Sequence, residues 1–291
     1  MAPTVSIIMP VYNGVDTIAS AIKSILNQSF PDFELMILDD GSTDGTSDLV
    51  RQFADPRIRL WQDARNRGTA VVQNFAIDHS RGEYIARMDA DDLSFSRRLE
   101  LQVAYLRSHA EVDLLSTGVV TFAAADGSVI GLLPQHETHE RIVSQPWRSF
   151  YMPHATWMGK AEWFKKHRYA VPESMRSDDQ EMLLRAYATS RFHSLPEVLY
   201  GYRLGEYKLK RVLLTRKALL TAQVRAFSRQ REIGNLAMAI AAAFAKTSFD
   251  LLAAIPFLRG FSFIRMVDTV PDAVKKELGS LYAECGASFR N

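Results

Sequence analysis

The first hundred residues alternate between short apolar runs and stretches in which apolar residues recur every three or four positions. The runs predict buried strands, and the recurring positions predict helices. The predicted strands cover residues 5–11, 33–38, 58–61 and 84–88, and the predicted helices begin at caps Asp16 and Asp44 and at Thr69. This alternation indicates βαβ units, and therefore an α/β fold with a mostly parallel, Rossmann-like sheet and helices on both faces.

Beyond residue 93 the alternation becomes less regular. We expect a helix over 96–110, a strand over 112–122, a helix over 177–189 and a strand over 198–202, with irregular chain between 134 and 172. From Lys208 onward the pattern predicts helices over 208–232 and 235–258 and then a short tail. The chain therefore divides into an α/β domain, residues 1–205, and a C-terminal helical appendage, residues 206–291.

One segment of the appendage is strongly apolar. Leu236–Ala245 holds ten uncharged apolar residues, after which Lys246 and Asp250 follow. A membrane-spanning helix needs about 20 such residues. The segment is therefore expected either to pack on the main domain or to lie along a membrane surface.

The composition is that of an ordinary globular protein, with 291 residues, of which 47% are hydrophobic and 23% charged. The single cysteine, Cys285, excludes an intramolecular disulfide and a multi-cysteine zinc site, and it is expected to be a passive thiol. The N-terminus carries no basic segment before its first apolar run, so we expect no signal peptide and a cytoplasmic location.

Charge is distributed unevenly along the chain. Residues 1–205 hold 21 Lys and Arg against 26 Asp and Glu, a net charge of −5, whereas residues 206–291 hold 14 against 7, a net charge of +7. An acidic first domain argues against nucleic-acid binding there. The basic region fits either an anionic membrane face or an ordinary solvated helical exterior.

Three carboxylate clusters carry the candidate chemistry. Asp39-Asp40 and the run Asp89-Ala90-Asp91-Asp92 each follow a predicted strand, and Asp178-Asp179 opens a predicted helix. In open parallel sheets, ligands bind at the carboxyl ends of strands. An Asp-x-Asp there offers oxygens to Mg²⁺ or Mn²⁺, which would neutralise phosphates. Taken one at a time, the three clusters could instead have structural roles: a turn with a helix cap, a solvated turn and an ordinary helix N-terminus.

The order and spacing of these clusters are similar to those of a known protein family. The chain resembles the family 2 glycosyltransferases of the A-type fold, in particular non-processive bacterial members, which are inverting enzymes that use nucleotide-diphosphate sugars. The resemblance covers roughly residues 5–205 and rests on six ordered segments: VSIIMPVYNG (5–14), SILNQSF (24–30), LDDGSTDGT (38–46), RNRGTAVVQNFAI (65–77), GEYIARMDADD (82–92) and DDQEMLLR (178–185).

The resemblance implies roles for the donor side of the site. Pro10, Tyr12, Asp39 and Asp40 would hold the base and ribose of a nucleotide-diphosphate sugar, most simply a UDP-sugar, with Asn66 and Gly68 near the base and diphosphate. The resemblance also implies Mn²⁺ or Mg²⁺, with Asp91 as the preferred ligand and Asp89 beside it, nearer the ribose or sugar.

On the acceptor side, the resemblance makes Asp179 the general base that takes a proton from the acceptor hydroxyl. Asp178 stands where the family usually has glutamate. The acceptor implied is a glycan or lipid-linked hydroxyl, and His154 lies where related enzymes build the acceptor pocket. The Gln-x-x-Arg-Trp motif of processive synthases does not occur, and Tyr202-Arg203 stands where non-processive members often have Tyr-Arg.

Three other functions are compatible with parts of this pattern. A nucleotidyltransferase of similar fold would carry a Gly-rich, basic loop after its first strand, which this sequence lacks. A catalytically silent sugar-nucleotide-binding subunit is disfavoured by the intact Asp91 and Asp179. A Rossmann dehydrogenase is disfavoured because no Gly-x-Gly-x-x-Gly follows the first strand.

The basic C-terminal region suggests a partner of its own. We expect residues 206–291 to make peripheral contact with a membrane, because basic residues cluster where the region begins: Lys208, Lys210, Arg211, Arg216 and Lys217. The alternatives are that the region packs on the catalytic domain or forms a homodimer contact.

Overall fold

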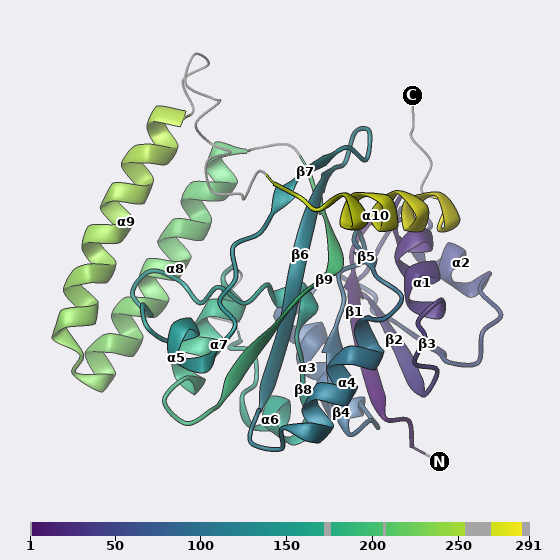
Figure 1. The fold of residues 1–291 in the computed structure, drawn as a ribbon, viewed down its shortest axis with the longest axis horizontal. Coiled ribbons are helices and arrows are strands. Elements are labelled where there is room, and N and C mark those ends of the chain that lie inside the picture. The colour runs from purple at the N-terminus through teal and green to yellow at the C-terminus, as the bar shows by residue number, and fades with distance from the viewer. Residues whose placement is uncertain (1, 172–175, 206–207, 254–268, 287–291) are drawn as a thin grey trace.

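A nine-stranded sheet forms the centre of the computed structural model, which describes residues 2–171, 176–205, 208–253 and 269–286 (Figure 1). The strand order is β3-β2-β1-β4-β8-β6-β9-β5, and β7 pairs with β6 outside this path.

The first half of the sheet is parallel. It consists of β1 (Val5–Val11), β2 (Phe33–Asp39), β3 (Ile58–Gln62) and β4 (Tyr84–Arg87), each pair of neighbours running in the same direction. These four strands confirm the predicted Rossmann-like half. Because they are parallel, the turns that follow β1, β2 and β4 meet at one edge of the sheet.

The second half of the sheet is mixed rather than parallel. β8 (Met158–Lys160) is antiparallel to both of its neighbours, β4 and β6 (Leu114–Ala123). β9 (Phe192–Leu204) is parallel to β6 but antiparallel to β5 (Leu93–Ser94), and β7 (Val129–Leu132) is antiparallel to β6. The expectation of a mostly parallel sheet therefore holds for the first four strands only.

Helices cover both faces of the sheet, as predicted. Alternate residues of β1 point to opposite faces: Ile7 and Met9 pack with α1 (Ile18–Leu26), α2 (Thr46–Arg51) and α4 (Arg98–Ser108), and Ile8 packs on the other face. That other face is covered by α3 (Thr69–His79), α5 (His139–Ile142), α6 (Ala161–Lys166) and α7 (Asp178–Ala186).

Two predicted helix caps are wrong in detail. The N-cap of α1 is Thr17 rather than Asp16, and the amides of Thr17 and Ile18 donate to the carbonyl of Gly14. The N-cap of α2 is Gly45, whose φ of 91° favours glycine. Asp44 precedes that cap, and its carboxylate accepts hydrogen bonds from the amides of Thr46 (3.0 Å) and Val15 (3.0 Å), joining the turns after β1 and β2.

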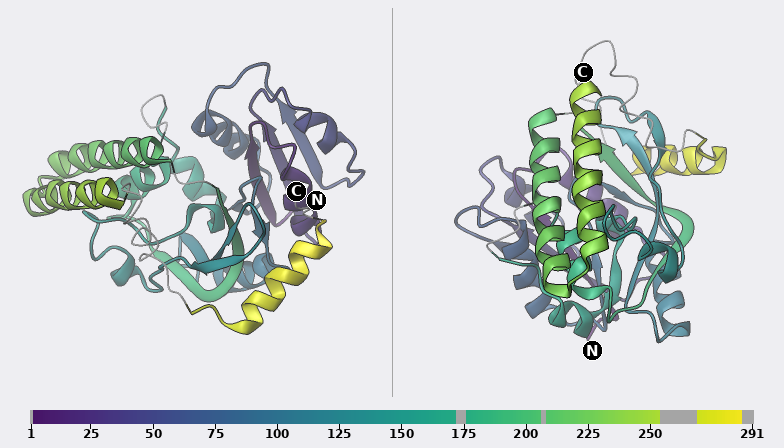
Figure 2. Two further views of the ribbon diagram at one scale, coloured as in Figure 1. Left: turned by 90° about the horizontal axis from the view of Figure 1, so that it is seen from above. Right: turned by 90° about the vertical axis from the view of Figure 1, so that its left-hand side faces the viewer.

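The C-terminal helices α8 (Leu209–Gln230) and α9 (Ile233–Ala253) form an antiparallel hairpin beside α7 (Figures 1 and 2). Phe227 of α8 is fully buried in the core that covers the α7 face, and Gln223 donates to the carbonyls of Pro146 (3.1 Å) and Trp147 (2.8 Å). The hairpin is thus packed on the α/β domain. The predicted end of the second helix, residues 254–258, lies outside the described residues.

The expected short tail contains a further helix, α10 (Asp272–Glu284), which packs across β6 and β5 (Figure 1). Leu278 and Leu281 join a core with Phe95 and Phe122. Cys285 lies in the same core, and burial raises the pKa of its thiol to about 11, which fits a passive thiol. Across the parts of the chain that the structure describes, the helices fall short of the length and hydropathy needed to cross a bilayer.

Candidate active site

The turn after β2 holds the segment before α3 in place. The Asp40 carboxylate accepts hydrogen bonds from the amides of Arg67 (2.7 Å) and Gly68 (2.9 Å), which precede α3. Gly41 has a φ of 79°, and a Cβ there would lie 2.6 Å from the backbone of Arg65. The close approach of the two backbones explains why glycine follows the carboxylate pair.

Both members of the carboxylate pair are buried, but only one of them borders a cavity. Asp39 is buried, and its oxygens accept hydrogen bonds from the Ser42 amide (2.8 Å) and the Ser47 hydroxyl. It lines neither of the cavities described below, whereas Asp40 lines the first. Asp40 is therefore the member of the pair that a ligand would meet.

A cavity of about 590 Å³ lies at the carboxyl ends of β1, β2 and β4. It brings together the residues expected on the donor side, Asp39 excepted: Pro10, Tyr12, Asp40, Asn66, Gly68, Asp89 and Asp91. Tyr12 is half exposed at its rim, where its ring is open to a ligand.

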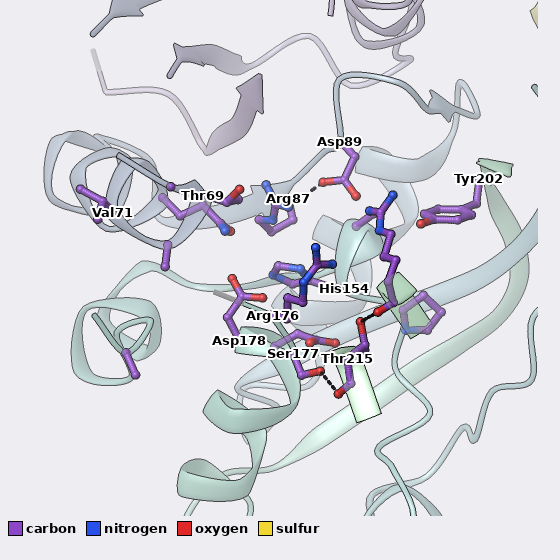
Figure 3. Close-up of a pocket in the computed structure, with 18 of the residues that line it drawn as sticks. Thr69, Val71, Arg87, Asp89, His154, Arg176, Ser177, Asp178, Tyr202 and Thr215 are labelled. Carbon is purple, nitrogen blue, oxygen red and sulfur yellow. Dashed lines mark hydrogen bonds and ion pairs between the residues drawn. The ribbon is translucent and has the colours of Figure 1, made fainter. Parts of the chain in front are cut away.

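A second cavity, of about 760 Å³, shares Asn66, Gly68, Thr69 and Asp89 with the first, so the two adjoin along these residues. Its far side holds Asp178 and Asp179 at the start of α7. In the view of Figure 3, Asp89 and Asp178 lie at opposite sides, with Arg87, Arg176 and His154 between them. The structure therefore places the Asp-x-Asp and the expected base around one space.

Arg87 is a residue that the sequence patterns did not single out. It ends β4 with almost no exposed surface, and its guanidinium contacts the Asp89 carboxylate at 2.6 Å. Its Nε has no hydrogen-bond partner among the residues described. Burial opposes its charge, but neighbouring groups, first Asp89, raise the pKa of Arg87 above its ordinary value. The signal in the sequence was a charged residue inside an otherwise apolar strand.

The start of α7 is fixed by Gln180, which was also missed. Its amide nitrogen donates to the Asp179 carboxylate (3.2 Å). Its amide oxygen accepts from the Ser149 hydroxyl (3.0 Å) and the Phe150 amide (2.9 Å). Gln180 therefore ties the orientation of Asp179 to a loop thirty residues earlier in the chain.

Both carboxyl groups at this helix start are held less acidic than usual. Burial, followed by the adjacent Asp179 carboxylate, raises the pKa of Asp178 to about 6. Burial also raises the pKa of Asp179, although the hydrogen bonds from Gln180 oppose the shift. A carboxylate with a raised pKa is a better proton acceptor near neutral pH.

His154 lines the same cavity and also has a structural contact. Its Nε2 lies 2.7 Å from the Tyr169 hydroxyl. Burial and the nearby Arg87 charge hold the pKa of His154 well below its usual value, so its imidazole is neutral at pH 7. Trp157, which packs edge-on against His154, is fully buried and belongs to the core.

The turn after β4 presents Asp91 outward while Asp92 points into the protein. Arg203 of β9 holds this turn, because its guanidinium donates to the Asp91 carbonyl (2.7 Å) and its amide donates to the Asp92 carboxylate (2.8 Å). Although Asp91 is exposed, the cleft wall partly desolvates its carboxylate, and this desolvation and the nearby Asp89 carboxylate raise the pKa of Asp91 to about 6. The site thus concentrates negative charge that a cation would offset.

No three His, Cys, Asp or Glu side chains converge on a possible metal position in the described ranges. Asp91 fits a metal site of another kind. Mg²⁺ is often held by one or two carboxylates together with substrate phosphates, and not by a full protein cage. Asp91, with Asp89 beside it, can supply that share of the ligands.

Comparison with known proteins identifies the fold and the family. The model of the family described as Glycosyl transferase family 2 matches residues 6–168. The putative glycosyltransferase EpsE of Bacillus subtilis (strain 168) is 37% identical over 215 residues, which are 72% of this chain and 76% of EpsE.

A shorter match is to a relative whose name states its donor and its acceptor. The UDP-Glc:alpha-D-GlcNAc-diphosphoundecaprenol beta-1,3-glucosyltransferase WfgD of Escherichia coli is 39% identical over 102 residues, 35% of this chain and 40% of WfgD. These matches favour sugar transfer over nucleotidyl transfer or a silent binding subunit.

The fold is also similar to that of a solved glycosyltransferase structure. Residues 1–349 of S. aureus TarS, solved with UDP-GlcNAc, superpose with a TM-score of 0.64 at 19% identity, covering 99% of this chain and 89% of that one. This likeness confirms the A-type glycosyltransferase fold.

Proposed function

Since this chain belongs to glycosyl transferase family 2 and is a transferase, we propose that it moves a sugar from UDP to an acceptor hydroxyl with inversion. The observation that carries the proposal is the pair of adjoining cavities, of which the smaller is lined by Asp40 and Asp91 and the larger by Asp179.

The donor nucleotide is assigned to the smaller cavity. Pro10, Tyr12 and Asp40 surround it, and the Asn66–Gly68 segment leads from it into the larger cavity. Uridine is the base we propose, because WfgD is named for UDP-Glc and TarS was solved with UDP-GlcNAc. The sugar would then lie in the larger cavity, between Asp89 and Asp178.

A divalent ion, Mn²⁺ or Mg²⁺, is proposed at Asp91 with Asp89 beside it. When bound, such an ion stabilises the charge of a departing diphosphate as a Lewis acid. The chain adds positive charge of its own, since Arg87, Arg176 and Arg211 all line the larger cavity. Together these groups offset the charge of the diphosphate in an otherwise acidic domain.

Asp179 is proposed as the general base. The acceptor hydroxyl oxygen bonds to the anomeric carbon opposite the diphosphate, the bond from that carbon to the diphosphate oxygen breaks, and the hydroxyl proton passes to Asp179. Gln180 keeps the Asp179 carboxylate oriented. His154, neutral and beside Arg87, can hydrogen-bond a sugar hydroxyl without adding charge.

The acceptor is proposed to be a glycan or a lipid-linked sugar. WfgD, by its name, acts on a sugar linked to diphosphoundecaprenol. The cavity beside Asp179 is open enough to admit such a sugar, and it is bordered by Tyr202, Arg211 and Thr215.

Release of UDP tests this function. The full chain is incubated with UDP-sugars, Mn²⁺ and a panel of glycan and lipid-linked acceptors, and the released UDP is measured. Parallel reactions with GDP-sugars, in which released GDP is measured, serve as controls. We expect UDP release that needs both acceptor and divalent ion. Formation of a nucleotide sugar from UTP and a sugar phosphate, with no UDP release from any donor, would assign nucleotidyl transfer instead.

The rate should depend on pH through the carboxyl pair at the start of α7. A general base acts only when deprotonated, so kcat/KM is expected to fall toward acid pH as Asp179, whose pKa burial raises, takes up its proton. The neighbouring Asp178 takes up a proton at about pH 6. The substitution Asp178→Asn removes a negative charge beside Asp179, lowers its pKa and moves the acid limb to lower pH. Arg87 and His154, which face the pair, stay unchanged.

The matched control for this pH profile is Glu181→Gln on the same helix, whose carboxylate pairs with Arg185. We expect its acid limb to coincide with that of the wild type. An Asp178→Asn profile that moves to higher pH would contradict the assigned proton acceptor.

A further inference from the structure

The outer surface of α9 reverses the usual pattern of a surface helix, in which apolar residues pack inward and charged ones face water. Large apolar side chains recur along its exposed face. The exposed fractions are 78% for Ile233, 51% for Ile240, 77% for Phe244 and 50% for Leu251. In the described part of α9, every residue classed as exposed is apolar or glycine.

The two charged residues of α9 face the protein. Lys246 donates to the carbonyl of Arg148 (2.8 Å), and Asp250, which is buried, pairs with Arg216 of α8 (2.9 Å). The helix has therefore turned its charges toward the rest of the protein and its largest apolar side chains outward. Such an arrangement is stable in water only at a cost, and it indicates that something covers the outer face.

The neighbouring helix, α8, gives the hairpin its positive charge. Residues 208–231 hold eight Lys and Arg and no Asp or Glu. Arg216 is paired with Asp250, and the other seven are exposed: Lys208, Lys210, Arg211, Lys217, Arg225, Arg229 and Arg231. Leu214 and Val224 are exposed among them.

We propose that the α8–α9 hairpin docks this protein on an anionic membrane surface. The apolar face of α9 enters the boundary between head groups and acyl chains, and the cations of α8 contact lipid phosphates. Figure 2 shows the hairpin as an outer layer at one side of the molecule, where both helices can meet a flat surface.

The charge and the chemistry of this face distinguish a membrane from other partners. A second copy of the chain would bring seven further exposed cations against this hairpin, and like charges repel. A protein partner would usually make about one hydrogen bond per 100–200 Å² of interface. The exposed residues of α9 offer no polar side chain for such bonds.

Docking would also bring the active site close to the membrane. Arg211 and Thr215 of α8 line the larger cavity, and a groove of about 400 Å³ between α7 and α8 shares Arg176 with it. A lipid-linked acceptor could then reach Asp179 while its lipid stays in the bilayer. This consequence rests on the proposed function, whereas the docking itself does not.

Flotation of the full chain with lipid vesicles tests the proposal without any sugar transfer. We expect binding to phosphatidylcholine vesicles that contain phosphatidylglycerol at low salt, little binding to phosphatidylcholine alone, and release at high salt. Two double variants should each reduce the bound fraction about 10-fold or more. One is Ile240→Asp with Phe244→Asp, and the other is Lys208→Glu with Lys210→Glu.

The matched control is Lys275→Glu with Lys276→Glu on α10, which makes the same charge change away from the hairpin. It should bind vesicles as the wild type does. All the substituted side chains are exposed, so thermal unfolding should confirm that each variant is folded.

Three outcomes would overturn the proposal. The first is a wild-type protein that stays unbound at low salt with anionic vesicles. The second is binding that the hairpin variants leave unchanged. The third is a wild-type dimer, seen by light scattering, that Phe244→Asp converts to monomer without any vesicle binding, which would make this face a contact between copies.

Discussion

Replacing Asp179 with asparagine should lower kcat by at least about 10²-fold, the scale of general-base catalysis. Asparagine has nearly the same shape and can still contact Gln180, which orients this position from the 149–150 loop. It cannot take a proton from the acceptor hydroxyl. Because Asp40 and Asp91 line the smaller cavity, donor binding should stay close to normal. Single-turnover transfer and isothermal titration with UDP measure the two effects separately.

A second variant separates the base from its support. Gln180→Ala removes the contacts to Asp179 and Phe150 but leaves the carboxylate, so it should lower kcat less than Asp179→Asn does. If Asp179→Asn keeps kcat within a few-fold of wild type, another group takes the proton. Asp178, which shares the helix start and whose pKa is about 6, would be the first candidate.

The part of the fold that could be predicted is the part with long or regular patterns. The apolar runs of β1 and β2 are buried on both faces, so their sequences are continuous and unambiguous. The helix predicted to begin at Thr69 begins at that residue in the structure. Parallel strands bring their carboxyl ends together, which is why Asp40, Asp89 and Asp91 could be expected around one cavity.

What could not be predicted depends on contacts between distant segments. β5 and β8 have two and three residues, too few to show a period of two, and each exists because longer strands pair with it. β9 begins before its predicted start because a register shift at residues 117–119 of β6 accommodates Pro196 and Glu197.

Two site residues were missed for the same reason. The role of Gln180 depends on a loop thirty residues away, and nothing local in the sequence announces that contact. Arg87 was counted as one residue of the predicted strand over 84–88, whereas its burial between Asp89 and His154 follows from how β4, α7 and the 150–156 segment assemble.

Replacing Asp91 with alanine should abolish the metal-dependent part of donor binding and lower transfer by at least about 10²-fold, since the diphosphate would leave without that charge stabilisation. The same change should not destabilise the metal-free protein. The pKa of Asp91 is raised to about 6 by partial desolvation and by Asp89. A raised pKa means that the folded state favours the protonated carboxyl, so the ionised form costs stability at pH 7 and above.

Thermal unfolding at pH 7.5 tests both the metal-dependent donor binding and the stability of the metal-free protein. This pH is roughly 1.5 above the raised pKa, so the Asp91 carboxyl is ionised. The wild type should gain Tm when UDP and Mn²⁺ are added together, and the gain should disappear with excess chelator. In Asp91→Ala that gain should be lost, while the Tm without ligands stays equal to or above that of the wild type. Asp48→Ala is the matched control, because its carboxylate is exposed on α2 and far from the turn after β4.

The alternative for Asp91 is that it serves the fold, as Asp92 does by accepting the Arg203 amide. A structural carboxylate would show a lower Tm without ligands when it is removed, and a Mn²⁺-dependent gain that survives. That pair of results would contradict the metal assignment. An unchanged or higher Tm without ligands, together with a lost Mn²⁺-dependent gain, would mean that the protein keeps a destabilising charge at the cavity edge. The physical reason for keeping that charge is a cation shared with the donor diphosphate.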